Sequence, residues 1–190
     1  MKKNLLIALL MTIVTTVLLG IIYPLVVTAL AQLFFKQKAN GQLIVKNGEI
    51  VGSRIIGQAF TGPAYFHSRP SSAGSGYDAA NSNGSQLGPT NRALIDRVTG
   101  DVTAYQADHP GQLVPIDLVT TSGSGLDPDI TPAAAEFQIA RIARERGTSE
   151  EELRRIVQQH TAERQFGFLG EPRVNVLELN LDLDAKFPRK

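Results

Sequence analysis

The sequence predicts an α+β protein that begins with a single transmembrane helix and continues into one soluble domain. Three observations lead to this fold class. Residues 5–35 contain no charged side chain, Asn47-Gly48 separates two β-branched runs, and two capped helical patterns follow one another after residue 131. Together they indicate a membrane anchor followed by a β-hairpin, about three helices and a C-terminal strand.

The membrane anchor is predicted over residues 1–36, with the helix itself over about residues 5–31. About 20 apolar residues cross the hydrocarbon core of a bilayer, and the uncharged run exceeds that length. Within hydrocarbon a single segment satisfies its backbone amides only as a helix. Lysines flank the run on both sides (Lys2, Lys3, Lys36 and Lys38), so the positive-inside rule does not decide the orientation.

A cleaved signal peptide is the main alternative for this segment. Ala29-Leu30-Ala31 has the small-x-small form of a cleavage site, and cleavage there would release a secreted domain. Signal peptides carry an apolar region of only about 7 to 15 residues. The longer run therefore favours a permanent anchor.

One side of the predicted helix carries small residues at every fourth position, namely Ala8, Thr12, Thr16 and Gly20. Small residues in such a row let another helix approach closely, and threonine hydroxyls can bond across the contact. We name this row the small-residue ridge, and it is the candidate contact with a partner helix. Chance spacing remains the alternative. Pro24 is expected to kink the helix or to mark its interfacial end.

The soluble domain is predicted over residues 37–190, the usual size of one domain. The chain has 19 basic and 18 acidic residues, and Lys2, Lys3 and Lys36 lie in the anchor. The domain thus carries 16 basic and 18 acidic residues, a net charge of −2. This balance argues against a nucleic-acid partner. The absence of cysteine excludes disulfides and thiolate metal sites.

Two segments of this domain have strand patterns. Residues 43–52 are predicted to form a β-hairpin, because both residues of the Asn47-Gly48 turn tolerate positive φ. Apolar residues alternate from Leu177 onward, so the segment from Val174 to Leu183 is predicted to be a strand buried on one face. We expect this strand to cover the hairpin, which needs a further layer for stability.

Residues 61–89 are predicted to form a long ordered loop that lies against the domain or against a partner. Loops of this length are uncommon unless they are functional or disordered. Tyr65, Phe66 and Tyr77 argue against a simple flexible linker, which would be short of aromatic residues. His67 and Arg69 lie beside these aromatics and can bond a partner. For His67, a bond to the loop's own carbonyl groups is the favoured alternative.

The remaining elements follow from caps and stop signals. Residues 91–107 are predicted to be a helix capped by Thr90 or Asn91. Residues 113–119 are compatible with a strand, but Pro115 favours a sheet edge or an irregular segment. Thr131 and Pro132 open a helix that ends near Arg146, and Ser149 opens another through a capping box. Five arginines of these two helices are predicted to form a solvated face, namely Arg141, Arg144, Arg146, Arg154 and Arg155.

A search for catalytic patterns predicts no catalytic residue and no metal site. Ser122-Gly123-Ser124-Gly125 has no following Gly-Lys-Ser/Thr and is not a phosphate-binding loop. No Gly-x-Ser-x-Gly or His-Glu-x-x-His motif is present. Asp127 and Asp129 are expected to form a turn and to favour the start of the next helix. A membrane-tethered extracytoplasmic hydrolase or binding domain, with a site assembled by the fold, remains the alternative.

Several motifs resemble one family, the C subunit of the Kdp-type potassium-transporting ATPase. They comprise residues 65–74, 81–91, 117–128 and 174–181, and they occur in the family's order. The resemblance covers the whole chain, anchor included. It implies an accessory, non-catalytic subunit of a high-affinity, ATP-driven potassium import complex in the bacterial inner membrane, with the soluble domain on the periplasmic side.

The resemblance further implies two partner subunits, one potassium-channel-like and one a P-type ATPase. It implies that this chain raises the ATPase subunit's affinity for ATP, although a periplasmic domain cannot touch a cytoplasmic nucleotide. ATP would then bind only through the ATPase subunit, and coupling would pass through the helix. Candidate partner contacts are the small-residue ridge in the bilayer and, outside it, residues of the long loop and its continuation, namely Tyr65, Phe66, His67, Arg69, Tyr77 and Gln86.

Overall fold

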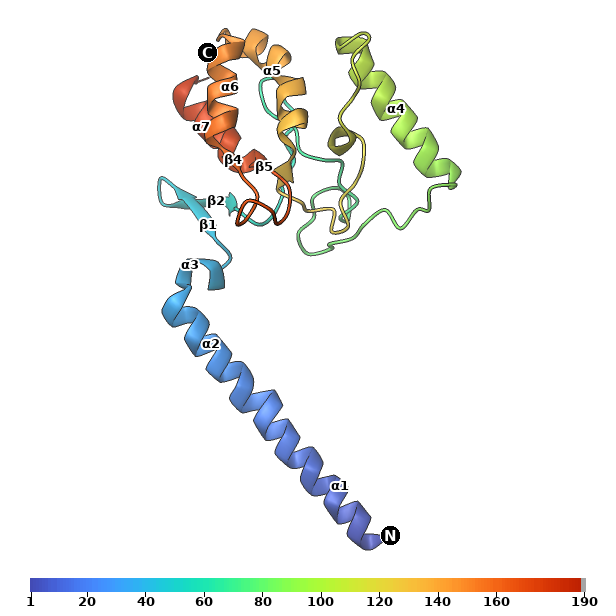
Figure 1. Ribbon diagram of the computed structural model, residues 1–190, viewed down its shortest axis with the longest axis vertical. Helices are drawn as coiled ribbons and strands as arrows, with labels where there is room; N and C mark the ends of the chain where they lie inside the picture. Colours follow the sequence, from blue (N-terminus) through green and yellow to red (C-terminus); the bar gives the residue numbers. More distant parts are fainter. Residues whose placement is uncertain (189–190) are drawn as a thin grey trace. The chain divides into compact units, whose positions relative to one another are not determined.

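The computed structural model describes residues 1–188, and its chain divides into two compact units, Met1–Leu43 and Ile44–Lys190 (Figure 1). We call the second unit the head. The division falls at Leu43, later than the predicted end of the anchor at residue 36.

The first unit is one long helix followed by a short one. Helix α1 (Lys2–Thr15), the π-helix η1 (Thr16–Ile22) and α2 (Tyr23–Phe34) run on without a break, and α3 (Lys36–Ala39) follows. The 33 residues Lys2–Phe34 are long and apolar enough to cross a membrane, and their side chains are exposed along almost the whole length. An exposed apolar helix of this kind fits a membrane span rather than the core helix of a soluble protein.

The π-helical segment lies immediately before Pro24. Proline lacks an N–H group, and its ring crowds the carbonyl group four residues earlier, here that of Gly20. Wider π turns before Pro24 relieve this crowding, and the helix continues beyond the proline to Phe34. Thr16 and Gly20 stay adjacent through this segment, because a Cβ atom added at Gly20 would lie 3.8 Å from Cγ2 of Thr16.

The predicted hairpin is present as β1 (Leu43–Lys46) and β2 (Glu49–Ser53). Asn47 and Gly48 have φ of 55° and 85°, as a two-residue turn of this kind requires. The expectation that a C-terminal strand covers the hairpin is wrong, because its strands pair only with each other and Val45 and Ile50 are exposed.

The predicted C-terminal strand exists but is short. Strand β5 (Arg173–Asn175) lies between β3 (Asp129–Ile130) and β4 (Thr161–Ala162) in an antiparallel sheet, where Val174 pairs with Ile130 on one side and with Thr161 on the other. Beyond Asn175 the strand prediction is wrong, since the chain forms α7 (Val176–Lys186).

Helix α7 begins where Asn175 caps it by accepting a hydrogen bond from the Glu178 N–H group. The residues that it buries follow helical spacing, and three of them, Leu177, Leu179 and Leu183, also fit a strand pattern. The leucines of this segment therefore fit both the period of a strand and the period of a helix. The Asn175 cap and the buried Asn180 indicate the helix.

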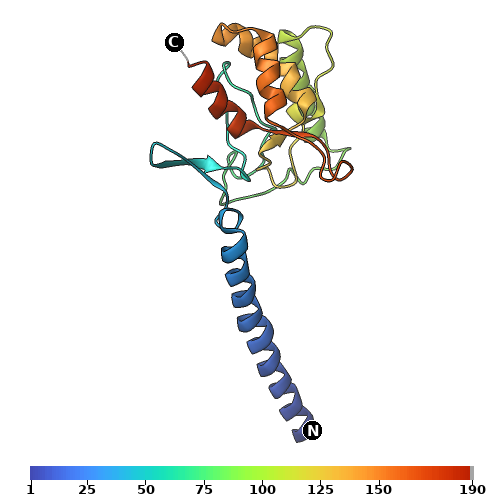
Figure 2. The same ribbon diagram turned by 60° about the vertical axis from the view of Figure 1, so that its left-hand side comes forward.

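The core of the head lies between α5 (Pro132–Arg146), α6 (Glu150–Gln159) and α7, and β5 contacts α5 and α7. Figure 2 shows these orange and red helices side by side. The Thr131 cap, the end of α5 at Arg146 and the Ser149 capping box are as predicted, and Gly147 ends α5 in a left-handed conformation. Fully buried side chains from all three helices meet in one cluster that includes Ile139, Ile142, Leu153, Leu179 and Leu183.

Helix α4 (Arg92–Asp108) matches its prediction, including its Asn91 cap, and its residues are exposed or half-buried. It contacts the core through Tyr105, whose ring meets that of Phe137 edge-on at 5.9 Å. At residues 113–119 the strand alternative is wrong and the irregular segment is confirmed, because this segment contains the 3-10 helix η2 (Ile116–Leu118). Pro115 cannot donate to a strand ladder, and its carbonyl group instead accepts from Leu118 N–H at 3.1 Å.

Part of the long loop packs into the core of the head. Phe66 is fully buried, and its N–H and carbonyl groups bond the side-chain amide of Asn180, both at 2.9 Å. The next residue, His67, is held in the same way by Gln138, at 2.7 and 3.2 Å. We call the buried side chains of Asn180 and Gln138 the amide clamp. They replace the hydrogen bonds that a strand neighbour would give to this segment.

The prediction of a solvated arginine face holds for Arg144, Arg154 and Arg155 but is wrong for two others. Arg146 has a fully buried side chain that pairs with Asp184 and donates to the Ala64 carbonyl at 2.9 Å. Arg141 is half-buried and donates to the Tyr65 carbonyl at 3.0 Å. Both arginines therefore fasten the long loop to helix α5.

Candidate functional site

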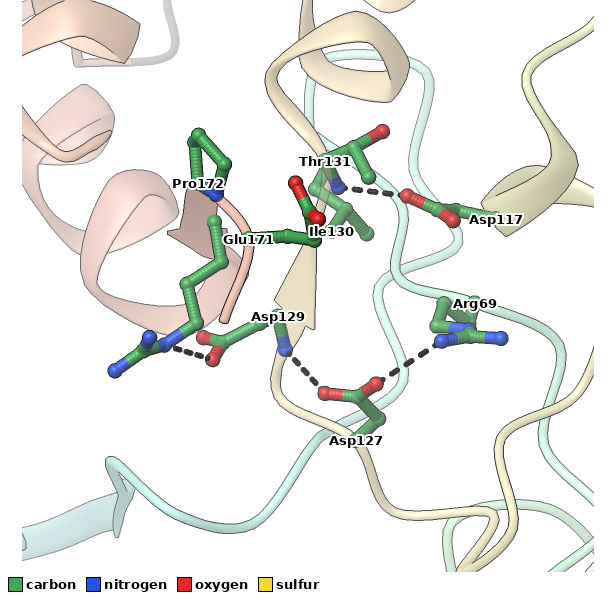
Figure 3. A pocket seen from close by; sticks show the side chains of 9 residues that line it. Arg69, Asp117, Asp127, Asp129, Ile130, Thr131, Glu171 and Pro172 are labelled. Carbon is green, nitrogen blue, oxygen red and sulfur yellow. Dashed lines mark hydrogen bonds and ion pairs between the residues drawn. The ribbon is translucent and has the colours of Figure 1, made fainter. Parts of the chain in front are cut away.

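Arg69 lies in the long loop between two cavities of the head. The first cavity, of about 280 Å³, is lined mainly by charged residues, and Figure 3 shows them: Arg69, Asp117, Asp127, Asp129, Glu171 and Arg173, with Ile130, Thr131 and Pro172. The second cavity, of about 320 Å³, lies toward α4 and includes His67, Tyr77, Asp101 and Tyr105. Arg69 is thus the residue that the two cavities share.

The Arg69 guanidinium bonds the segment that follows η2. It pairs with Asp127 at 3.1 Å and approaches the carbonyl groups of Thr120 and Thr121 at 3.4 and 3.5 Å. The Tyr77 hydroxyl donates to the Arg69 carbonyl group. Arg69 therefore ties two irregular segments together with both its side chain and its backbone.

The three aspartates of the first cavity already accept hydrogen bonds from the protein (Figure 3). Asp117, which is buried, accepts from the Thr131 N–H group at 2.7 Å. Asp127 accepts from Asp129 N–H at 3.0 Å, the turn role predicted for it. Asp129 pairs with Arg173 at 3.0 Å. Burial raises the pKa of Asp129, and the charge of Arg173 opposes that shift.

These occupied carboxylates limit what the first cavity can bind. Throughout residues 1–188, no group of three or more histidine, aspartate or glutamate side chains is placed to hold a metal ion. A carboxylate that already pairs with arginine or a backbone N–H group is fixed in orientation, and part of its acceptor capacity is used. The cluster is arranged to join β3, α5 and the loops.

Two glycine-rich and serine-rich segments are joined along one side of this cluster. The Ser124 carbonyl accepts from the Asn83 N–H group at 2.9 Å, and the Gly125 carbonyl accepts from the Ser71 hydroxyl at 2.6 Å. Gly125 has φ of 68°, and a Cβ atom added there would lie 2.5 Å from the Asn83 carbonyl oxygen. Only glycine fits this position, so these glycines serve the packing of one loop on the other.

The predicted contact residues of the loop are mostly used inside the head. Phe66 has no exposed surface, and the Tyr65 hydroxyl donates to Asp184 at 2.9 Å. The His67 Nε2 atom lies 3.0 Å from the Gly62 carbonyl oxygen, which confirms the alternative in which His67 bonds its own loop. Gln86 is exposed, lies outside both cavities and donates to Asn83 at 2.8 Å.

The second cavity brings His67, Arg69 and Tyr77 together with helix α4. Burial lowers the pKa of His67; its hydrogen bond to Gly62 opposes this shift, and the charge of Arg141 adds to it. Burial also raises the pKa of Tyr77. The cavity therefore holds a neutral imidazole and a neutral phenol beside one guanidinium that is already paired.

Sequence reasoning did not find Gln138, Asn180 or Asp117, which position this region. Each is a buried polar side chain within an otherwise apolar pattern. That pattern was the available signal, because buried polar groups are nearly always bonded. The pattern does not reveal the partner, since Asn180 and Phe66 are 114 positions apart.

Comparison with known proteins gives a match along nearly the whole chain. The family model described as KdpC, the K+-transporting ATPase c chain, matches residues 5–185. A relative from Koribacter versatilis is 68% identical over 188 residues, which cover 99% of this chain and 97% of the relative. A relative from Acidobacterium capsulatum is 56% identical, with 93% and 95% covered, and one from Mycobacterium bovis is 52% identical, with 97% and 99% covered. All three are named potassium-transporting ATPase KdpC subunit.

We expect Arg69→Gln to lower the free energy of unfolding of the head by about 1–3 kcal/mol, because a half-buried aspartate loses its charged donor. Arg92→Gln is the matched control, since Arg92 and Asp96 form an exposed pair within α4. Exposed pairs of this kind contribute less than about 1 kcal/mol. Denaturant unfolding measures both variants. Equal losses for the two would contradict the joining role of Arg69.

The lowered pKa of His67 predicts a pH dependence of stability. The unfolded histidine gains a proton near its ordinary pKa of 6.5, whereas the folded one does so only at lower pH. The free energy of unfolding should therefore fall as the pH drops below 6.5 and level off below the folded pKa. His67→Gln should flatten this dependence, and His109→Gln should leave it in place. Thermal midpoints from pH 8 to 5 measure it, and an unchanged slope in His67→Gln would refute the assignment.

Proposed function

The chain belongs to the KdpC family, and we propose that it serves as the accessory subunit of an ATP-driven potassium import complex in a bacterial inner membrane. The observation that carries this proposal is the extent of the match. It runs from residue 5 to residue 185 and so includes both the apolar helix and the head. Relatives that share both units are named as subunits of a potassium-transporting ATPase.

The proposed role of this chain is non-catalytic. Its charged cavity supports this role, because Asp117, Asp127 and Asp129 are occupied by donors of the head itself. A hydrolase would need a carboxylate, histidine or hydroxyl group placed to act on a substrate. The alternative of a membrane-tethered hydrolase is therefore not favoured.

The proposed partners are a potassium-channel-like subunit and a P-type ATPase subunit, with the head on the periplasmic side. ATP is bound on the cytoplasmic side in this arrangement, so the head would not reach it. We propose that the chain raises the ATPase subunit's affinity for ATP through contacts of its membrane helix and of the head with the partners. Such coupling requires a structural element with two conformations. Both the contact with this chain and the binding of ATP must shift the equilibrium between these conformations.

The small-residue ridge is the proposed contact within the bilayer. Thr16 and Gly20 lie side by side within η1, and π-helical turns are often found at functional sites in helices. A neighbouring helix can approach closely along such a row. Thr12 donates to the Ala8 carbonyl at 2.9 Å, so its hydroxyl is available to a neighbour as an acceptor.

The test compares two bulky substitutions in the membrane helix within the complete complex. We expect Gly20→Phe to reduce the amount of this chain that co-purifies with its partners in mild detergent, and to raise the ATP concentration at half-maximal activity. Val14→Phe, on the opposite side of the helix from the ridge, is the control and should change neither quantity.

Two results would contradict the proposal. If Gly20→Phe and Val14→Phe both leave co-purification unchanged, the ridge is not the contact. If the chain purified alone hydrolyses ATP or another substrate, and this activity is lost on changing one aspartate or histidine, the accessory role itself is wrong.

A further inference from the structure

A turn between β4 and β5 displays apolar side chains to solvent. In the segment Gln165–Gly170, Phe166 is 86% exposed, Phe168 71% and Leu169 47%. In the described part of the head, the other four phenylalanines are buried or half-buried. We call this segment the apolar turn. Exposed apolar patches mark sites that contact a protein or a membrane. The two exposed rings at the tip of this turn indicate such a site.

The apolar turn has a fixed conformation in the free chain. Gln165 and Leu169 exchange two backbone hydrogen bonds, both at 2.9 Å. Below them an ion pair between Arg164 and Glu171 closes the base at 2.5 Å. Phe166 has φ of 54°, a region that a bulky side chain rarely adopts. The fold thus holds both aromatic rings outward in spite of this backbone cost.

The apolar turn is also suited to a medium without water. No residue from Gln165 to Gly170 is charged. Four of its six backbone N–H groups are used internally, since Gly167 donates to Arg164 at 3.1 Å and Phe168 to Gln165 at 3.3 Å, besides the exchanged pair. A segment with most of its N–H groups already bonded loses fewer hydrogen bonds when it leaves water.

A bilayer is always within reach of the head. The apolar helix ends at Phe34 and β1 begins at Leu43, so residues 35–42 are all that connects the helix to the hairpin. Eight residues extend over at most about 30 Å. The head is therefore held at the membrane surface, where the local concentration of lipid is high regardless of any partner.

We infer that the apolar turn is a second membrane contact, in which Phe166 and Phe168 enter the headgroup region of the bilayer. Leu169 adds apolar area, and Arg164 with Glu171 stays at the level of the polar headgroups. Apolar side chains that enter the headgroup region bind the membrane reversibly. The inference does not depend on the partner subunits.

The test uses the fact that the chain contains no tryptophan. Phe168→Trp introduces a single indole in the apolar turn, and Leu113→Trp introduces one at a control position that is 92% exposed. Each full-length variant is reconstituted alone into vesicles of phosphatidylcholine and phosphatidylglycerol, with and without brominated acyl chains. Thermal unfolding in detergent verifies that both variants keep the parent's transition.

We expect the Phe168→Trp emission to shift to shorter wavelength and to lose roughly half its intensity to brominated lipid, as an indole about 5–10 Å deep would. Leu113→Trp should emit as in water. Adding Phe166→Ser to Phe168→Trp should reduce the quenching. Water-like, unquenched emission from Phe168→Trp would overturn the inference. A shift that requires co-reconstituted partner subunits and shows no lipid quenching would also overturn it, and would assign the turn to a protein contact.

Discussion

The amide clamp is the interaction on which the rest of the head depends. A loop can enter a core only if its backbone N–H and carbonyl groups find partners. Asn180 and Gln138 provide these partners for Phe66 and His67, four hydrogen bonds in all. Phe66 can then fill the space between α5 and α7. From this fixed point the chain leads directly to Arg69, which joins it to the segment around Asp127.

Because the polar groups of the head bond one another, few of them are left to act on a substrate. Its buried charges, glycines and aspartates serve the joining of one segment to another. The resulting rigid surface favours docking, because its side chains and loops lose little conformational entropy on binding. The apolar turn, in contrast, leaves the rings of Phe166 and Phe168 exposed. The KdpC family membership gives this arrangement its context, since relatives in the family are named as subunits of a potassium-transporting ATPase.

Local signals predicted a large part of this structure. The uncharged run, the Asn47-Gly48 turn and the Ser149 capping box each act over a few residues, so the sequence alone was sufficient for them. Errors arose where two local patterns coincide, as in α7, whose leucines alternate and also fit a helix. The candidate site was harder to predict, because the burial of Gln138 and Asn180 is explained by their bonds to loop residues distant in the sequence. Their burial depends on tertiary contacts that no short window contains.

Hydrogen exchange of the backbone amides of Phe66 and His67 in the native, full-length chain tests the central claim most directly. Both N–H groups donate to buried side chains, at 2.9 and 2.7 Å. If the clamp holds the loop as part of the core, these two amides exchange only through global unfolding, with the same protection as amides in the middle of α5. Exchange at the rate of the exposed loop residues around Gln86 would show that the loop opens on its own, and would contradict the account.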